Sequence, residues 1–225
     1  MQLTKTTNMN IALIGATGFV GSAILKEAMT RNMKVTAIVR NTGKLASGDQ
    51  SLHVVKGDVM NTEELAGLLK GHDVVISAYN PGWTNPEIYS EFIKGTQSIQ
   101  EATKRAGVQR LMVIGGAGSL FVAPGVQLVD TKEFPGEWKP GALAARDYYS
   151  IIQKEQDLEW TFVSPAIEMH PGTSGIRKGT YRTGTDSPVF DETKRSVISV
   201  EDLAVAVIDE AEKGLFKRRR FTVAY

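Results

Sequence analysis

Residues 15–21 read GATGFVG, and they lie where an apolar run hands over to an amphipathic one. The spacing predicts a strand over 10–14 (NIALI) and a helix from about 19 to 30. Gly15 permits the tight turn between them, Gly18 lets the backbone approach a pyrophosphate, and Gly21 lets the helix pack closely on the strand. The first amides of the helix then face the phosphates, which the helix dipole favours. The stretch therefore predicts a dinucleotide-binding turn.

Length and composition exclude several classes of protein. The chain has 225 residues, is 42% hydrophobic and 23% charged, and carries a net charge of +1, which argues against disorder and against bulk nucleic-acid binding. It has no cysteine, so disulfides, thiolate metal sites and cysteine nucleophiles are excluded, and its three histidines are too scattered to predict a metal site. No apolar run approaches the ~18 residues of a membrane span, and the first ten residues lack a signal-like core. We expect a soluble cytoplasmic protein, a monomer or small homo-oligomer, with a small-molecule partner and neither nucleic acid nor membrane.

Short β-branched runs alternate with longer helical patterns, which is typical of parallel strands joined by crossover helices. The runs are KVTAIV (34–39), SLHVV (51–55), DVVIS (73–77), RLMVI (110–114), WTFV (160–163) and FTVA (221–224). Asn61 followed by Glu64 predicts a capped helix start, and Ser199 followed by Asp202 predicts another for a helix over 200–212. The pattern indicates an α/β protein.

Two stretches interrupt this alternation, at about 115–141 and 168–199. The second contains RKGTYRTGTDSPVFD (177–191), which resembles a hairpin. Both follow strands that should end at the carboxyl edge of the sheet, where open α/β sheets bind their ligands. We expect these insertions to form the walls of a substrate site. By contrast, the basic run 217–220 is too short for a nucleic-acid surface and is interpreted as a solvated loop.

The residue after the second strand bears on the choice of coenzyme. An acidic residue there would accept hydrogen bonds from the ribose hydroxyls of NAD, but the chain has Arg40. A guanidinium suits a 2′-phosphate, and Lys44 follows one turn later as a second cation. The alternative is a solvated arginine at a strand end. Together with the glycines, the pattern favours NADP(H) over NAD(H).

Several segments, in this order, resemble the atypical short-chain dehydrogenase/reductases. They are GATGFVG (15–21), VR (39–40), GDV (57–59), SAYNPG (77–82), EWTFVSPA (159–166) and ISVEDLA (198–204). The nearest branch is the small NAD(P)H-binding group that includes flavin reductase/biliverdin reductase B-like and NmrA-like proteins. The resemblance covers nearly the whole chain. It implies a single NAD(P)-binding Rossmann domain over residues 1–225, with a doubly wound parallel sheet of about seven strands and helices on both faces.

The resemblance also implies contacts for the coenzyme. Asp58 would accept from the adenine amino group while Val59 packs near the ring; otherwise Asp58 is an ordinary turn residue. Ser77 and Ala78 would line the coenzyme at the end of the fourth strand, and residues 164–167 would run beside the nicotinamide. The expected coenzyme-binding residues are Gly15, Thr17, Gly18, Phe19, Val20, Gly21, Arg40, Lys44, Asp58, Val59, Ser77, Ala78, Ser164, Pro165 and Ala166.

The superfamily's usual proton-donating pair, Tyr-x-x-x-Lys, is missing from its expected place. Aligned on EWT at 159–161, the two positions fall on Ala142 and Arg146. Tyr149 and Lys154 are five residues apart, a rotation of about 140° that puts them on different helix faces. The serine that usually accompanies the pair would fall at or near Ala117. This absence favours hydride transfer to a conjugated acceptor such as a flavin or quinone, whose delocalised anion solvent can protonate.

Residues for the acceptor itself are harder to assign from sequence. The acceptor-binding candidates are Asn80, Trp83, Phe121 and Trp138. The aromatic members alternatively only pack the loops. The catalytic candidates are Ser119, Tyr79 and His170. The chain is thus interpreted as an NADP(H)-dependent reductase, with two alternatives: a non-catalytic NADP(H)-binding sensor and, ranked below it, an NAD-dependent epimerase or dehydratase.

Overall fold

A large, mostly parallel sheet forms the centre of the protein. The computed structural model describes residues 9–45 and 49–225. Eight strands lie in the order β3-β2-β1-β4-β5-β8-β10-β9. They are β1 (Asn10–Ile14), β2 (Lys34–Val39), β3 (Leu52–Lys56), β4 (Val74–Ser77), β5 (Arg110–Ile114), β8 (Glu159–Ser164), β9 (Arg182–Gly184) and β10 (Arg219–Ala224). Seven of these strands pair in parallel and β9 alone is antiparallel, which confirms the predicted Rossmann-type sheet and adds an edge strand.

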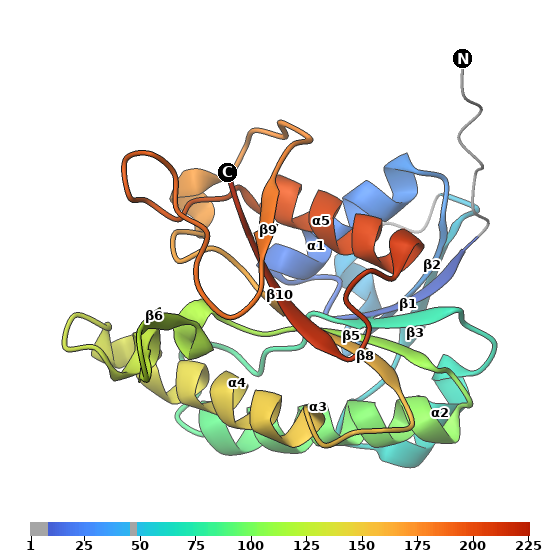
Figure 1. Cartoon of the computed structure of the whole chain (residues 1–225). Helices are drawn as coiled ribbons and strands as arrows, with labels where there is room; N and C mark the ends of the chain where they lie inside the picture. Colours follow the sequence, from blue (N-terminus) through green and yellow to red (C-terminus); the bar gives the residue numbers. More distant parts are fainter. Residues whose placement is uncertain (1–8, 46–48) are drawn as a thin grey trace.

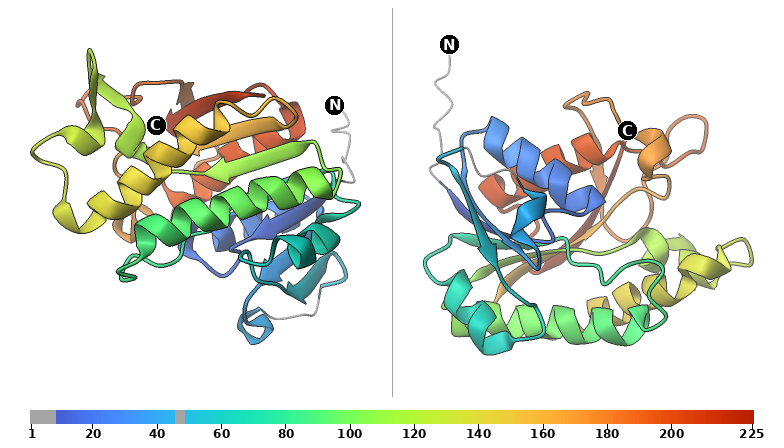
Figure 2. Two further views of the ribbon diagram at one scale, coloured as in Figure 1. Left: turned by 90° about the horizontal axis from the view of Figure 1, so that it is seen from below. Right: turned by 180° about the vertical axis from the view of Figure 1, so that it is seen from behind.

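Helices cover both faces of this sheet (Figure 1). One layer contains α1 (Phe19–Thr30) and α5 (Val200–Lys213). The other contains α2 (Thr62–Leu69), α3 (Ile88–Arg105) and α4 (Lys139–Ile152), which lie side by side in Figure 2. Within the described residues, no helix combines the length and the apolar character that crossing a bilayer requires.

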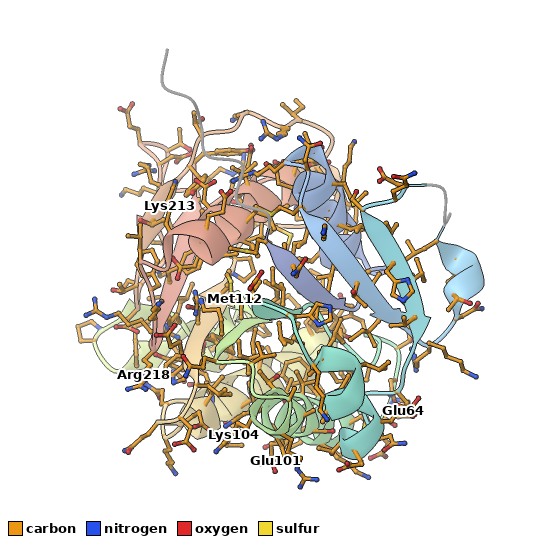
Figure 3. All side chains as sticks on the ribbon, turned by 90° about the vertical axis from the view of Figure 1, so that its right-hand side faces the viewer. Glu64, Glu101, Lys104, Met112, Lys213 and Arg218 are labelled. Carbon is orange, nitrogen blue, oxygen red and sulfur yellow. The ribbon has the colours of Figure 1, made fainter. Side chains whose placement is uncertain are left out.

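Alternating strand residues supply two cores, one under each helix layer. Ile11 and Leu13 of β1 pack with α1 and α5, whereas Ala12 and Ile14 pack with α2, α3 and α4. Strands buried on both faces in this way are typical of parallel sheets. Met112 of β5 is fully buried, and Figure 3 shows it between the helix layers.

Local sequence patterns predicted the bounds of several strands and helices correctly. The observed bounds of β1, α1, β2 and β5 are those predicted. Asn61 accepts from the Glu64 amide at the start of α2. Ser199 likewise accepts from the Asp202 amide at the start of α5.

Two expectations were wrong. Residues 177–191 do not form a hairpin, because β9 pairs with β10 and not with a second strand inside this segment. The only two-stranded hairpin in the described chain joins β6 (Phe121–Ala123) to β7 (Val126–Gln127) inside the first insertion. The basic run 217–220 is not simply a solvated loop, since its last two residues begin β10 and Arg220 is only 3% exposed.

Candidate functional site

The turn between β1 and α1 lies against the end of β4, where the strand order reverses direction. Gly15 has a φ of +82°, and a Cβ built on it would lie 2.5 Å from the Ala78 carbonyl oxygen. A Cβ on Gly21 would lie 2.0 Å from the Gly15 carbonyl oxygen. Both positions therefore require glycine, one for backbone conformation and close approach and the other for close packing. The turn occupies the crevice at which doubly wound sheets bind nucleotides.

Among the described residues, no side chain caps the first turn of α1. Gly18 is the N-cap of the helix, and the first turn has no acidic residue. Thr17, Gly18 and Phe19 are exposed, with Val20 partly so. Unpaired amides and the positive end of the helix dipole favour a phosphate at this position.

Arg40 follows β2 and is exposed. Within residues 9–45 and 49–225 its guanidinium has no hydrogen-bond or ion-pair partner. Its charge acts on the Tyr79 hydroxyl, as does that of Asp58, so the three side chains share one neighbourhood. Lys44 ends a short 3₁₀ helix, Thr42–Lys44, and is also exposed. The structure therefore leaves a cation available beside the crevice.

The residues expected near the adenine and the ribose have mixed environments. Asp58 is exposed, but its Oδ1 accepts from the Met60 amide at 2.9 Å, as in an ordinary Asx turn. Val59 is buried in the core against α2. Ser77 is buried at the end of β4, and Ala78 is partly buried beside Gly15. The exposed part of this set is compatible with a bound nucleotide.

Tyr79 is held by α3. Its hydroxyl donates to the Glu91 carbonyl oxygen, and its ring stacks on Phe92 with 6.3 Å between centroids. A Cβ on Gly95 would lie 2.4 Å from the ring, so this glycine makes room for it. Burial, with the Glu91 charge second, raises the pKa of Tyr79 to about 12. The phenol therefore stays protonated at neutral pH and is fixed in position.

Beyond β8, the chain expected to run beside the nicotinamide is mostly buried. Ser164, Pro165 and Ala166 are buried, and the Ser164 hydroxyl has no hydrogen-bond partner in the described part of the chain. His170 is exposed, and its Nδ1 accepts from the Gly172 amide at 3.1 Å, capping the 3₁₀ helix Pro171–Thr173. Its role in the structure is that of a cap.

The two positions of the usual proton-donating pair lie on α4. Ala142 is buried beneath the turn after β5. The two are in close contact: a Cβ built on Gly118 of that turn would lie 3.0 Å from the Cβ of Ala142. Arg146 pairs with Asp147 and Asp130 at 3.0 and 3.3 Å. Lys154 lies beyond the end of α4. At the two positions of the usual pair, α4 therefore carries the methyl group of Ala142 and the ion-paired guanidinium of Arg146.

Ser119 has a partner that sequence reasoning missed. The side chain is 2% exposed, and its hydroxyl oxygen accepts from Arg220 at 2.9 Å. Arg220 comes 101 residues later, and only its place on β10 brings it here. The single available signal was the apolar run that follows it, FTVA (221–224), which extends backward into the basic cluster.

Two of the acceptor-binding candidates, Phe121 and Trp138, lie in the first insertion, and the other two, Asn80 and Trp83, follow β4. Trp83 is 57% exposed, and its ring lies over the start of α4, where a Cβ on Gly141 would be 2.7 Å away. Phe121 and Trp138 are exposed as well. Asn80 uses its Oδ1 to accept from the Gly82 amide at 2.7 Å, closing a turn. The aromatic rings offer apolar faces, whereas Asn80 is engaged locally.

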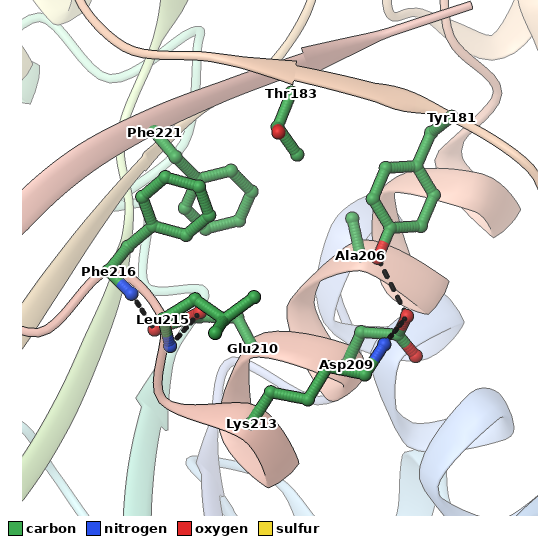
Figure 4. Close-up of a pocket in the computed structure, with 9 residues that line it drawn as sticks. All are labelled: Tyr181, Thr183, Ala206, Asp209, Glu210, Lys213, Leu215, Phe216 and Phe221. Carbon is green, nitrogen blue, oxygen red and sulfur yellow. Dashed lines mark hydrogen bonds and ion pairs between the residues drawn. The ribbon is translucent and has the colours of Figure 1, made fainter.

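A pocket elsewhere, between α5, β9 and β10, has its charged groups already paired (Figure 4). Tyr181 and Lys213 both donate to Asp209. Glu210 accepts from the amides of Leu215 and Phe216. No residue of the Gly-rich turn lines it. Across the described residues, no group of three His, Cys, Asp or Glu side chains could hold a metal ion.

Comparisons with known proteins agree with this geometry. A family model described as NAD(P)H-binding matches residues 15–211. The protein YwnB of Bacillus subtilis (strain 168) is 39% identical over 96% of this chain and 98% of its own length.

Two solved structures are also similar. One, from Bacteroides thetaiotaomicron and provisionally assigned as an epimerase, is 44% identical with a TM-score of 0.90, covering 97% of this chain and 98% of its own. Another, from Streptococcus pneumoniae TIGR4 and provisionally assigned as an NADH-flavin reductase, is 34% identical with a TM-score of 0.81, covering 96% and 99%. With a Gly-rich turn, a free helix N-terminus and a family match over most of its length, the chain belongs to the NAD(P)H-binding family.

Proposed function

We propose that the protein is an NADPH-dependent reductase that delivers hydride to a small conjugated acceptor such as a flavin or quinone. The observation that carries the proposal is the combination of an uncapped α1 N-terminus with Arg40 at the end of β2, a cation that has no hydrogen-bond or ion-pair partner among the described residues. The first suits a diphosphate and the second a 2′-phosphate. The flavin reductase relative is named for NADH, so the preference for NADPH rests on Arg40 alone.

The residues present fit such a coenzyme, because the cradle at Gly15 and Gly21 has no room for a Cβ. The turn and α1 would hold its diphosphate, and Arg40 its ribose phosphate. When bound, the reduced coenzyme supplies a hydride. The chain's part is to bind and align the two partners, while water supplies the proton that completes reduction of a delocalised acceptor. Ala142 and Arg146 supply no acid for an isolated ketone.

The test begins with fluorescence titration of NADPH and NADH, followed by a screen of flavins and quinones for stimulated NADPH oxidation. We expect tighter binding of NADPH and turnover with at least one conjugated acceptor. Equal affinity for the two coenzymes would remove the proposed preference. Binding without turnover of any acceptor would instead support the sensor. An epimerase is disfavoured, because its chemistry uses the acid–base pair that these positions lack.

A further inference from the structure

We propose that Arg220 is a positioning residue that joins the two insertions and thereby sets the shape of the acceptor side of the site. It links the segment 117–121, which ends at the first residue of β6, to the segment 184–190, which starts at the last residue of β9. We call Arg220, Ser119 and Asp186 the clamp. The assignment of this region as the acceptor side rests on the proposed function.

One buried guanidinium contacts both segments. Its Nη1 donates to the carbonyl oxygen and the hydroxyl of Ser119 at 3.0 and 2.9 Å. Its Nε and Nη2 donate to Asp186 Oδ1 at 3.2 and 2.5 Å. The Arg220 side chain is 1% exposed, whereas that of Asp186 is 62% exposed. The planar fork therefore bridges an inner turn and an outer segment.

Other contacts make the clamp rigid. The Phe121 amide donates to the Asp186 carbonyl oxygen at 2.8 Å, and Gln127 donates to the Ser119 carbonyl oxygen at 3.1 Å. The guanidinium also lies over the ring of Tyr149 on α4, 4.5 Å from its centroid. A lysine could reproduce neither the fork nor the stacking.

The cost of burying a cation argues for a role beyond stability. Asp186 is mostly exposed, so the ion pair itself adds little stability, whereas directional bonds from a planar guanidinium select one arrangement of the groups they join. The arrangement selected here is that of the turn 117–119, which packs through Gly118 on Ala142. The clamp thus fixes the chain beside Ala142, the position where the superfamily's usual proton donor would fall.

The kinetic test compares Arg220→Met, Ser119→Ala and Asp186→Asn with Arg219→Met, the exposed neighbour on the same strand. We expect the acceptor KM to rise about tenfold in Arg220→Met and less in the other two, because small misplacements in a site are costly. The NADPH dissociation constant should change by less than about twofold, and Arg219→Met should behave as wild type. Once Arg220 is replaced, adding Asp186→Asn should have no further effect.

Arg220→Lys should give an intermediate acceptor KM, since it keeps the charge and loses the fork. An unchanged acceptor KM in Ser119→Ala and Asp186→Asn, in a wild type that reduces the acceptor, would overturn the positioning role and leave the proposed function intact. A fall in NADPH affinity as large as the rise in acceptor KM would also overturn the positioning role, because general unfolding would produce both changes together.

Amide hydrogen exchange tests the clamp without any turnover. In Asp186→Asn, residues 117–121 and 184–190 should both exchange faster, while β1 and α1 keep their protection. Faster exchange in only one segment would overturn the clamp. A wild type that reduced none of the acceptors would refute the proposed function, and exchange would then decide the clamp by itself.

Discussion

At the scale of single residues, the most consequential side chain is Arg40. It follows β2, is exposed, and has no hydrogen-bond or ion-pair partner in the part of the chain that the structure describes. An exposed guanidinium acts through what binds beside it. The residues around it, Asp58 and Tyr79, lie at the carboxyl edge of the sheet and are close enough to interact electrostatically.

Replacing Arg40 by Ala should weaken NADPH binding by about 1–3 kcal/mol, the usual cost of losing hydrogen bonds to a charged group. NADH lacks the 2′-phosphate, so its affinity should barely change. Fluorescence titration of both coenzymes measures the difference, with Lys34→Ala as the control because Lys34 is exposed at the opposite end of β2. A loss of the same size for both coenzymes would contradict the role.

At the scale of elements, the packing of α1 on β1 depends on one missing side chain. Gly21 lies in the first turn of α1, directly against the Gly15 carbonyl. The helix can therefore come close enough for its free amides to reach the crevice. Gly67 of α2 is a helical glycine that makes no such close contact, because a Cβ built on it would meet no neighbouring atom within 4 Å.

Gly21→Ala should lower the free energy of unfolding by about 1–3 kcal/mol through overpacking. It should also weaken NADPH and NADH alike, since both share the diphosphate. Gly67→Ala is the matched control and should be stabilising by up to about 1 kcal/mol, because it only improves helix propensity. Urea denaturation measures both variants, and equal effects from the two would refute the packing argument.

At the scale of the whole molecule, a buried carboxylate ties the second insertion to the helix layer. Glu27 of α1 is 4% exposed and accepts from Arg177 at 2.8 and 2.9 Å. It also pairs with Arg31, which reaches Asp209 of α5 at 2.7 Å. One network therefore joins α1, α5 and the segment 168–199. The hydrogen bonds from Arg177 are the main cause that lowers the pKa of Glu27.

This network should make stability depend on pH. With the pKa of Glu27 lower in the folded state, its contribution is full above the unfolded value of 4.5 and is lost as the pH falls through the folded pKa. Glu27→Gln should therefore cost about 1–2 kcal/mol at pH 7, and the difference from wild type should shrink below pH 4.5. Urea denaturation at pH values from about 3 to about 7 measures this difference, with the exposed variant Glu192→Gln as the control. A difference that stayed constant with pH would contradict the assignment.

Local patterns were enough to predict β1, α1, β2, β5 and the Gly-rich turn, because apolar periodicity, capping residues and glycine geometry act within a few residues of one another. Contacts between distant segments could not be predicted in this way. Arg177 lies 150 residues from Glu27 and Arg220 lies 101 residues from Ser119, and nothing in their spacing indicates that they meet. Likewise β9 lies beside β10 because the sheet had an open edge, not because of a hairpin turn. The Gly-rich turn is a property of one strand–turn–helix unit, whereas the contacts that join the two insertions depend on how the whole chain folds.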